Sequence, residues 1–423
     1  METLTLGSTG PNVKLIQSLL NRIGYNAGPV DGGYGAQTQQ AVTAFQKKNR
    51  LSPDGVVGPV TWNLFDRLLL GYDTYYIQPG DTFYKIARKY YTTLNAILAA
   101  NPGINPNALA VGQRIVVPYG IDIVFTDIDY TYEILDRQLR GLRVRFPFLE
   151  VTSIGQSVLG SNLYVVRLGR GSNHVSYNAT HHANEWINTT LLMKFIENFA
   201  KAYSVGGKLG NYSIPDIWNR SSIFLVPLVN PDGVDLVNYW PDYPDPALTQ
   251  AAKINTTGLP LPSVWKANIR GTDLNLNYPA DWEAEHQLEI DQGITGPAPR
   301  DYGGPSPLSE PESTAMVNFT RQHNFRLVIA YHTQGEIIYY GYNNLEPPET
   351  ANIAQLFSRV SGYSISHNPG EASYAGYKDW FVQEFRKPGF TIEVGTGVNP
   401  IPLTQFPRTY SQNEEILVLG AIV

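Results

Sequence analysis

Five short apolar runs after Asp122, separated by stretches of helical periodicity, restrict the fold more than any other feature of the chain. Runs of this length are typical of buried strands, and strands that alternate with helices indicate an α/β domain. The expected strands are Leu163–Leu168, His174–Thr180, Ile223–Val229, Arg326–Tyr331 and Gly389–Val394. The expected helices are Trp186–Tyr203 and Glu310–His323, and the second opens with the capping-box spacing of Ser309 and Glu312.

Polar residues stand where four of these runs end. His182 follows the second run, Asn230 the third and His332 the fourth, and Glu393 lies near the end of the last. Ligands of open α/β sheets bind at the carboxyl ends of the strands. The chain has no cysteine, so a metal there must be held by imidazoles and carboxylates. His182 and Glu185 form an H-x-x-E pair which, with a second histidine, provides the donors of a hydrolytic zinc site. By itself this pair arises often by chance, as a histidine satisfied within the core.

Charge and hydropathy exclude two classes of partner. The net charge is −6 at pH 7, and no block of like charges stands out, which argues against nucleic acid. The first residues, METLTLGSTG, lack the basic start and apolar core of a secretory signal. No stretch approaches the roughly 18 apolar residues that a membrane span needs. The chain is therefore expected to be soluble, with no membrane partner and with its export route open.

Residues 1–71 are predicted to form a small three-helix module. Val13, Ile16, Leu19 and Leu20 recur at helical spacing, and two turns, DGGYGAQT at 31–38 and DGVVGPVT at 54–61, repeat one pattern. Each turn places a threonine where it could cap the next helix. The alternative is a generic three-helix unit. The order of these segments resembles the peptidoglycan-binding domain of bacterial wall hydrolases, which implies peptidoglycan as a partner.

Residues 73–119 are predicted to form a βααβ module. A strand at Tyr75–Ile77 is followed by the turn Pro79–Thr82, two short helices and a closing strand near Ile115. The segments YYIQPGDTFYKIARKY, ILAANPGIN and LAVGQRIVVP resemble a LysM module. This resemblance implies binding to glycans that contain N-acetylglucosamine, and the alternative is the same fold without a ligand.

Residues 122–423 resemble the zinc carboxypeptidase (carboxypeptidase A-like) family. The motifs are H-x-x-E at 182–185, PLVNPDG at 227–233, D-x-N at 273–275, GPSPLSEPES at 304–313, AYHTQ around His332 and FTIEVG around Glu393. The resemblance implies a mixed, largely buried sheet flanked by helices. It also implies one Zn²⁺ held by His182, Glu185 and His332, Glu393 as the general base, and Asp273 as the acceptor that orients His182.

Three positions depart from the family pattern. The Asn-Arg pair that binds a C-terminal carboxylate reads Asn275-Leu276, so recognition of an ordinary C-terminus is in doubt. Arg270 or Lys266 is expected to supply the cation that stabilises the oxyanion, with Arg270 preferred because it keeps the residue type. Tyr374 or Tyr377 is a candidate for the tyrosine that covers the substrate.

These departures, together with the two wall modules, resemble the γ-D-glutamyl-meso-diaminopimelate peptidase (endopeptidase I) branch. The resemblance implies a bacterial enzyme that cleaves between γ-D-Glu and diaminopimelate in the stem peptides of peptidoglycan. The alternatives are an amidase acting between muramic acid and L-Ala, a general metallocarboxypeptidase, and a wall-binding protein with an inactive peptidase domain. A spore-associated role and release on lysis are both open.

Overall fold

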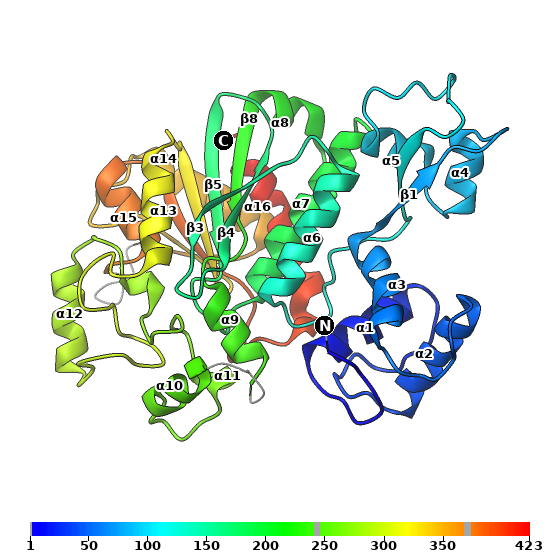
Figure 1. The fold of residues 1–423 in the computed structure, drawn as a ribbon. Coiled ribbons are helices and arrows are strands. Elements are labelled where there is room, and N and C mark those ends of the chain that lie inside the picture. The colour runs from blue at the N-terminus through cyan, green and yellow to red at the C-terminus, as the bar shows by residue number, and fades with distance from the viewer. Residues whose placement is uncertain (1, 241–245, 368–373) are drawn as a thin grey trace. The chain divides into compact units, whose positions relative to one another are not determined.

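The computed structural model describes residues 2–240, 246–367 and 374–423 and divides the chain into two compact units (Figure 1). The first unit contains residues 1–129 and 133–150, and the second contains 130–132 and 151–423. The predicted boundary between residues 71 and 73 falls inside the first unit. The helices and strands of the first unit are α1 (Pro11–Arg22), α2 (Ala36–Lys48), α3 (Pro59–Leu70), β1 (Tyr72–Tyr76), α4 (Phe83–Lys89), α5 (Leu94–Ala100), β2 (Arg114–Pro118) and most of α6 (Tyr132–Arg145).

Two buried glutamines hold the two repeated Asp-Gly turns of the first unit. The Gln17 side-chain amide donates to Asp31 Oδ1 at 2.9 Å, and Gln17 Oε1 accepts from the Gly32 amide at 3.0 Å. Gln46 repeats this arrangement with Asp54 at 2.9 Å and with the Gly55 amide at 2.9 Å. Both glycines have positive φ angles, 82° and 68°, which explains why each aspartate is followed by glycine.

The prediction that Thr38 and Thr61 cap the following helices is wrong. The N-caps of α2 and α3 are Gly35 and Gly58, and the threonines lie inside the first turn. Thr38 and Thr61 instead accept hydrogen bonds from the amides of Gln17 and Gln46 at 3.2 and 3.1 Å. The repeated threonine therefore belongs to the glutamine-centred network.

We expect Gln46→Ala to loosen the second turn of this module. The substitution leaves the buried Gly55 amide without its acceptor, and an unsatisfied buried group costs about 1–3 kcal/mol. Hydrogen exchange of the whole chain should show the free energy of local opening around residues 46–61 falling by about 2 kcal/mol. Gln40→Ala, at an exposed position of the same helix, is the control. Unchanged exchange in Gln46→Ala would contradict the structural role of this network.

The βααβ part of the first unit pairs β1 with β2 antiparallel, from Tyr72 opposite Pro118 to Tyr76 opposite Arg114. Thr82 caps α4 by accepting from the Lys85 amide at 3.2 Å. The helices cover the two strands with a small apolar core of Ile77, Phe83, Ile86, Ala87, Ile97, Ile115 and Val117.

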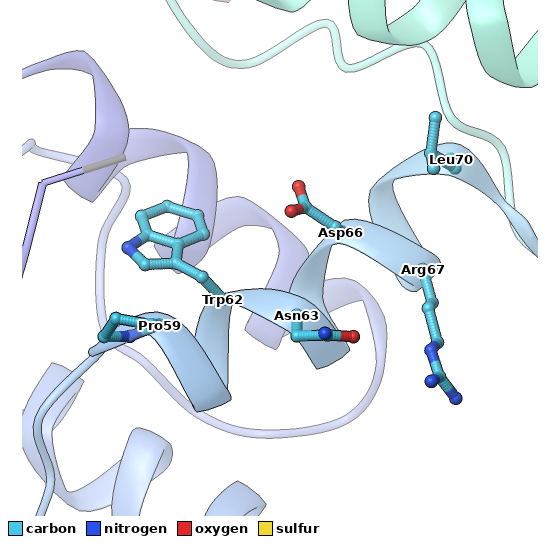
Figure 2. A pocket seen from close by; sticks show the side chains of 6 residues that line it. All are labelled: Pro59, Trp62, Asn63, Asp66, Arg67 and Leu70. Carbon is cyan, nitrogen blue, oxygen red and sulfur yellow. The ribbon is translucent and has the colours of Figure 1, made fainter.

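Helix α3 carries an open hollow on its surface (Figure 2). Within the first unit, the carboxylate of Asp66 at this hollow lies 3.5 Å from the guanidinium of Arg137. The lining of the hollow contains both apolar and polar or charged side chains. The lining residues are Pro59, Trp62, Asn63, Asp66, Arg67 and Leu70.

The second unit is built on a mixed sheet of eight strands in the order β11-β10-β12-β9-β5-β8-β4-β3. The four central strands, β12, β9, β5 and β8, are parallel, whereas β10 and β4 join them antiparallel. The predicted α/β fold with a largely buried mixed sheet is confirmed. The strands are β3 (Glu150–Gln156), β4 (Asn162–Leu168), β5 (Asn173–Ala179), β8 (Ser221–Val226), β9 (Leu327–His332), β10 (Ile337–Tyr340), β11 (Ser364–His367) and β12 (Gly389–Glu393), with a separate two-stranded pair of β6 (Lys208–Leu209) and β7 (Tyr212–Ser213).

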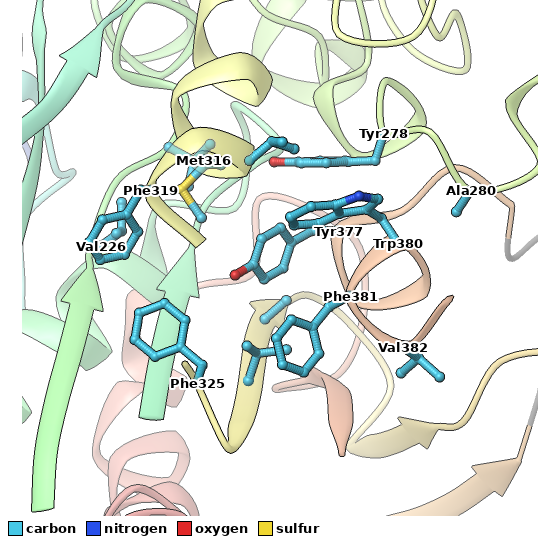
Figure 3. Packing of buried hydrophobic residues seen from close by; sticks show 14 of the residues in the cluster. Val226, Tyr278, Ala280, Met316, Phe319, Phe325, Tyr377, Trp380, Phe381 and Val382 are labelled. Atoms are coloured by element: carbon cyan, nitrogen blue, oxygen red, sulfur yellow. The ribbon is translucent and has the colours of Figure 1, made fainter. Parts of the chain in front are cut away.

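Helices accompany the sheet, and their aromatic side chains supply much of its core. Figure 3 shows side chains of α15 packed with Tyr278, Phe319 and Phe325. Among the described residues, no helix combines the length and apolar character needed to cross a membrane. The helices are α7 (Ile187–Ser204), α8 (Ile214–Arg220), α9 (Pro231–Asn238), α10 (Pro246–Ile254), α11 (Leu261–Val264), η1 (Leu274–Leu276), α12 (Trp282–Asp291), α13 (Pro311–Arg321), α14 (Glu349–Ser361), α15 (Tyr377–Phe385), η3 (Leu403–Gln405) and α16 (Phe406–Leu419).

The predicted strands and helix ends of the second unit differ from the structure at several positions. The third predicted strand runs to Val229, but β8 ends at Val226, because the chain turns there toward α9. The capping box at Ser309 and Glu312 is wrong. Glu310 is the N-cap of α13, and Glu312 Oε1 instead accepts from the Val158 amide at 3.1 Å. The sequence analysis also missed the strands β3, β10 and β11.

Candidate active site

A sharp exit from β5 places the H-x-x-E pair at the end of the sheet. Thr180 has a φ angle of 62°, which is rare for a β-branched residue, and its hydroxyl contacts the Thr189 hydroxyl at 2.9 Å. A turn follows in which the Glu185 amide donates to the His182 carbonyl at 3.2 Å. This turn brings the side chains of His182 and Glu185 to the same side of the chain.

Three buried donors converge at this point. His182 Nδ1 lies 2.9 Å from Glu185 Oε1, and His332, the last residue of β9, brings its Nδ1 within 3.3 Å of both His182 Nδ1 and Glu185 Oε2. One ligand atom from each of the three residues lies within 4.8 Å of the others. No other group of three such residues in the described part of the chain meets this condition.

The geometry of these donors fits a zinc ion. Ligands of tetrahedral zinc lie about 2.1 Å from the metal and therefore about 3.4 Å from one another. The observed separations of 2.9–3.3 Å are close to this value. Two imidazoles and one carboxylate, without a thiolate, are the usual protein ligands of a hydrolytic zinc centre. The residues present therefore fit the metal.

The electrostatic field at His182 favours a positive charge. Burial alone would lower the pKa of His182, but the carboxylates of Glu185 and Asp273 outweigh it and raise this pKa to about 9. Burial would raise the pKa of Glu185, yet His182 and Lys266 hold it well below its usual range. Glu185 is thus ionised, and its field attracts a cation, whether proton or metal.

Asp273 orients His182 from the opposite side of the ring. His182 Nε2 lies 3.1 Å from Asp273 Oδ1, which leaves Nδ1 to face Glu185 and His332. Burial would raise the pKa of Asp273, but His182 holds it below its usual range, so the carboxylate accepts this hydrogen bond. Asp273 also accepts from the backbone amides of Asn275 at 3.1 Å and Asp301 at 3.3 Å, which fixes its own position.

We expect Asp273→Asn to weaken zinc binding by about 10- to 100-fold, because an amide is a poorer acceptor for the imidazole N–H than a carboxylate. The measurement is competition for zinc against a coloured chelator. Asp291→Asn, at an exposed position of α12, serves as the control. Equal affinity of the two variants would show that Asp273 is a turn acid with no influence on the metal.

Glu393 lies beside the three donors. It is the last residue of β12 and stands opposite His332 in the parallel pairing of β12 with β9. Its Oε2 is buried and makes no hydrogen bond to the described residues. Burial and the charge of Glu185 raise the pKa of Glu393 to about 8, partly offset by Lys266 and His182. A buried carboxyl with a raised pKa and a free oxygen suits proton transfer.

The structure places Lys266, and not Arg270, at the site. Lys266 Nζ lies 3.5 Å from Glu185 Oε1, and 19% of its side chain is exposed. Burial would lower the pKa of Lys266, but Glu185 and Asp273 raise it, so the ammonium stays charged. Arg270 instead lies 3.5 Å from Glu310 Oε2, so the preference for Arg270 has no support in the geometry.

The prediction that Tyr377 binds substrate is wrong. Tyr377 has no exposed surface, and its hydroxyl lies 3.0 Å from the Thr320 hydroxyl, inside the aromatic core of Figure 3. Asn275 is half-buried, and its Oδ1 accepts from the Tyr377 amide at 3.2 Å. Asn275 lies beside Asp273, to which its backbone amide donates, whereas the ring of Tyr377 packs in the core.

Sequence reasoning missed two further groups. Asn399 donates to Glu185 Oε1 at 3.2 Å and to the Thr333 carbonyl at 3.1 Å, and the Thr333 amide donates to Glu185 Oε2 at 3.1 Å. Arg300 follows Pro299, whose carbonyl accepts from the Lys266 and Ala267 amides at 2.8 and 3.0 Å. No sequence spacing pointed to either residue, because both arrive on loops far along the chain.

Asn230, one of the polar residues at the strand ends, links two backbone segments near the site. Its amide donates to the carbonyls of His181 and Ala267, both at 3.0 Å, and its Oδ1 caps α9 by accepting from the Gly233 amide. Asn230 therefore joins the loop before His182 to the segment that carries Lys266. Its side-chain amide bonds to backbone groups and not to the metal donors.

Family models match three parts of the chain. Residues 135–415 match the zinc carboxypeptidase model, residues 9–65 a putative peptidoglycan binding domain, and residues 75–118 the LysM domain. The first match covers more than half of the chain, and the other two fall in the first unit.

Individual relatives agree with these matches. The chain is 41% identical to gamma-D-glutamyl-L-diamino acid endopeptidase 1 of Lysinibacillus sphaericus, over 81% of this chain and 98% of that protein. It is 37% identical to the uncharacterized protein YqgT of Bacillus subtilis, over 68% of this chain and 76% of that protein. The structure of thrombin activatable fibrinolysis inhibitor shares the fold, with a TM-score of 0.56 at 16% identity over 83% of this chain and 97% of that one.

Proposed function

Since the chain belongs to the zinc carboxypeptidase family, we propose that it hydrolyses the amide bond between the γ-carboxyl of D-Glu and meso-diaminopimelate in the stem peptides of peptidoglycan. The enzyme class is that of a zinc metallopeptidase. The observation that carries the proposal is the buried group of His182, Glu185 and His332 with Glu393 beside it. The name of the Lysinibacillus relative supports this choice of bond.

In this proposal His182, Glu185 and His332 hold the zinc ion, and Asp273 and Asn399 keep His182 and Glu185 in place. Zinc, when bound, polarises the scissile carbonyl and acidifies the attacking water. Glu393 accepts a proton from that water as the water oxygen bonds to the carbonyl carbon. When the carbon–nitrogen bond breaks, Glu393 gives the proton to the departing amine. Lys266 stabilises the negative charge that develops on the carbonyl oxygen.

The substrate preference is proposed from what the site lacks. Leu276 replaces the arginine with which the family's exopeptidases bind the carboxylate of a C-terminal residue. Without this guanidinium, a free carboxylate next to the scissile bond on the amine side gains no charged partner at this position. Cleavage inside a stem peptide, where that carboxyl is joined to a further residue, is therefore accommodated.

Peptidoglycan binding by the two N-terminal modules is supported by the family matches in residues 9–65 and 75–118. We assign the glycan strand to these modules and the stem peptide to the second unit. The βααβ part exposes the rings of Tyr76, Tyr84 and Tyr91, which are 56%, 64% and 91% accessible and could stack on sugars. Linked modules raise the local concentration of the enzyme at the polymer.

One muropeptide separates this function from the alternatives. N-acetylmuramoyl-L-Ala-γ-D-Glu-meso-diaminopimelyl-D-Ala is incubated with the zinc-loaded protein, and the products are identified by mass spectrometry. The proposal predicts N-acetylmuramoyl-L-Ala-D-Glu and diaminopimelyl-D-Ala, and no products in the presence of a chelator. Release of N-acetylmuramic acid would indicate an amidase, loss of D-Ala alone a carboxypeptidase, and intact substrate a binding protein.

A further inference from the structure

Arg300 is a cation at the edge of the site that the mechanism does not use. Its Nε donates to Asp301 Oδ2 at 2.7 Å, and within the described chain its two terminal nitrogens have no hydrogen-bond partner. About half of the side chain, 53%, is exposed. The guanidinium therefore has donors free for a ligand, unlike Lys266, whose ammonium is held by Glu185.

The loop that carries Arg300 is fixed against the catalytic segment. The Lys266 and Ala267 amides donate to the Pro299 carbonyl at 2.8 and 3.0 Å, and the Asp273 amide donates to the Tyr302 carbonyl at 2.7 Å. The Ala183 amide donates to the Lys266 carbonyl at 3.0 Å, which joins this segment to the loop of His182. The backbone on both sides of Arg300 is thus fixed to the segment of Lys266 and Asp273, which is itself joined to the loop of His182.

The charges around Arg300 agree with this position. Burial would lower the pKa of Arg300, but Asp301, Asp273 and Glu185 outweigh it and raise this pKa. The charge of Arg300 in turn acts to lower the pKa of Lys266, as expected for two cations that repel each other. Neighbouring cations attract an anionic ligand.

Resting on the proposed function, we infer that Arg300 binds the free α-carboxylate of the γ-linked D-Glu residue. A glutamate joined through its γ-carboxyl keeps this carboxylate three carbons, two methylenes and the α-carbon, from the scissile carbonyl, on the acyl side. An acyl residue with an uncharged side chain in an ordinary α-peptide has no charge there. Lys266 would lie at the carbonyl oxygen and Arg300 farther out at the carboxylate, so Arg300 would select an acidic acyl residue, such as γ-linked D-Glu, over an uncharged one. Leu276 leaves the amine side without a comparable group.

The test compares two peptides, L-Ala-γ-D-Glu-meso-diaminopimelate and the same peptide with the α-carboxylate converted to an amide. The wild-type enzyme should prefer the carboxylate peptide in kcat/KM by on the order of 10- to 100-fold. Arg300→Gln should lose this preference, mainly through a higher KM for the carboxylate peptide, and should leave the amide peptide unaffected. Arg300→Lys should recover part of the preference.

Arg140→Gln is the matched control, because Arg140 also makes one Nε bond to an aspartate, at 2.9 Å, and has a similar exposure of 57%. Calorimetry with zinc-loaded Glu393→Gln protein measures binding of both peptides without turnover. If Arg300→Gln weakens both peptides equally, or neither, the inference fails even when the γ-D-Glu bond is cleaved. If the wild-type enzyme cleaves neither peptide, the proposed function fails, and the binding preference alone decides the role of Arg300.

Discussion

Glu393→Gln is expected to lower kcat for the stem peptide by about 10³- to 10⁴-fold while leaving one zinc ion per chain. Glutamine keeps the size of the side chain but cannot accept the proton of the attacking water. Glu393 is placed for this role by the pairing of β12 with β9, which sets it opposite His332. Steady-state kinetics and metal analysis of the same sample separate the loss of the base from the loss of the metal.

The control for this substitution is Glu349→Gln, which removes an exposed acid at the start of α14. It should retain wild-type kcat and zinc content. If Glu393→Gln keeps more than a tenth of the wild-type kcat, another group must accept the proton. If it loses zinc, Glu393 acts on the metal site and not as the base.

His332→Ala is expected to weaken zinc binding by on the order of 10³-fold or more and to abolish hydrolysis, because one of three protein ligands is removed. Zinc at a hundredfold excess over its Kd stabilises the folded wild-type protein by about 2.7 kcal/mol. For a unit of this size, that corresponds to a rise in Tm of about 5 °C. The variant should show no such rise, which a thermal scan with and without zinc will measure.

Glu185→Gln is a second ligand variant, which keeps the test valid if His332→Ala fails to fold. It keeps the shape of a side chain that contacts Lys266, Asn399 and the Thr333 amide, yet removes the charge that attracts the metal. It too should lose the zinc-dependent rise in Tm. His286→Gln, on α12, should keep it. A full rise in both ligand variants would show that these residues do not bind the metal.

The central part of the fold could be predicted because its strands are buried on both faces. All residues of β8 and β9 are buried, and such strands appear in the sequence as continuous apolar runs. The missed strands lie toward the sheet's edges. β3, for example, has the polar sequence EVTSIGQ and is largely exposed, so it shows no such run. The local hydrophobic pattern therefore predicts the central strands of the sheet but not the strands toward its edges.

The candidate site divides in the same way. His182, Glu185 and His332 lie at the ends of neighbouring parallel strands, so their proximity follows from strand order and a short turn. The positions of Lys266, Arg300 and Asn399 depend on backbone bonds between distant loops, such as that from Lys266 to Pro299, and no local pattern encodes them. Tyr377 is a candidate only because it lies in the sequence near the position where the family has its tyrosine, and this nearness does not set the direction of its ring, which is buried.

The most direct test of the zinc site is X-ray absorption at the zinc edge of the loaded protein. The proposal predicts nitrogen and oxygen ligands at about 2.0–2.1 Å with the outer-shell scattering of two imidazoles. One imidazole should disappear in any zinc retained by His332→Ala. A metal surrounded only by oxygen, or a spectrum unchanged in that variant, would contradict the assignment of His182, Glu185 and His332 as the ligands.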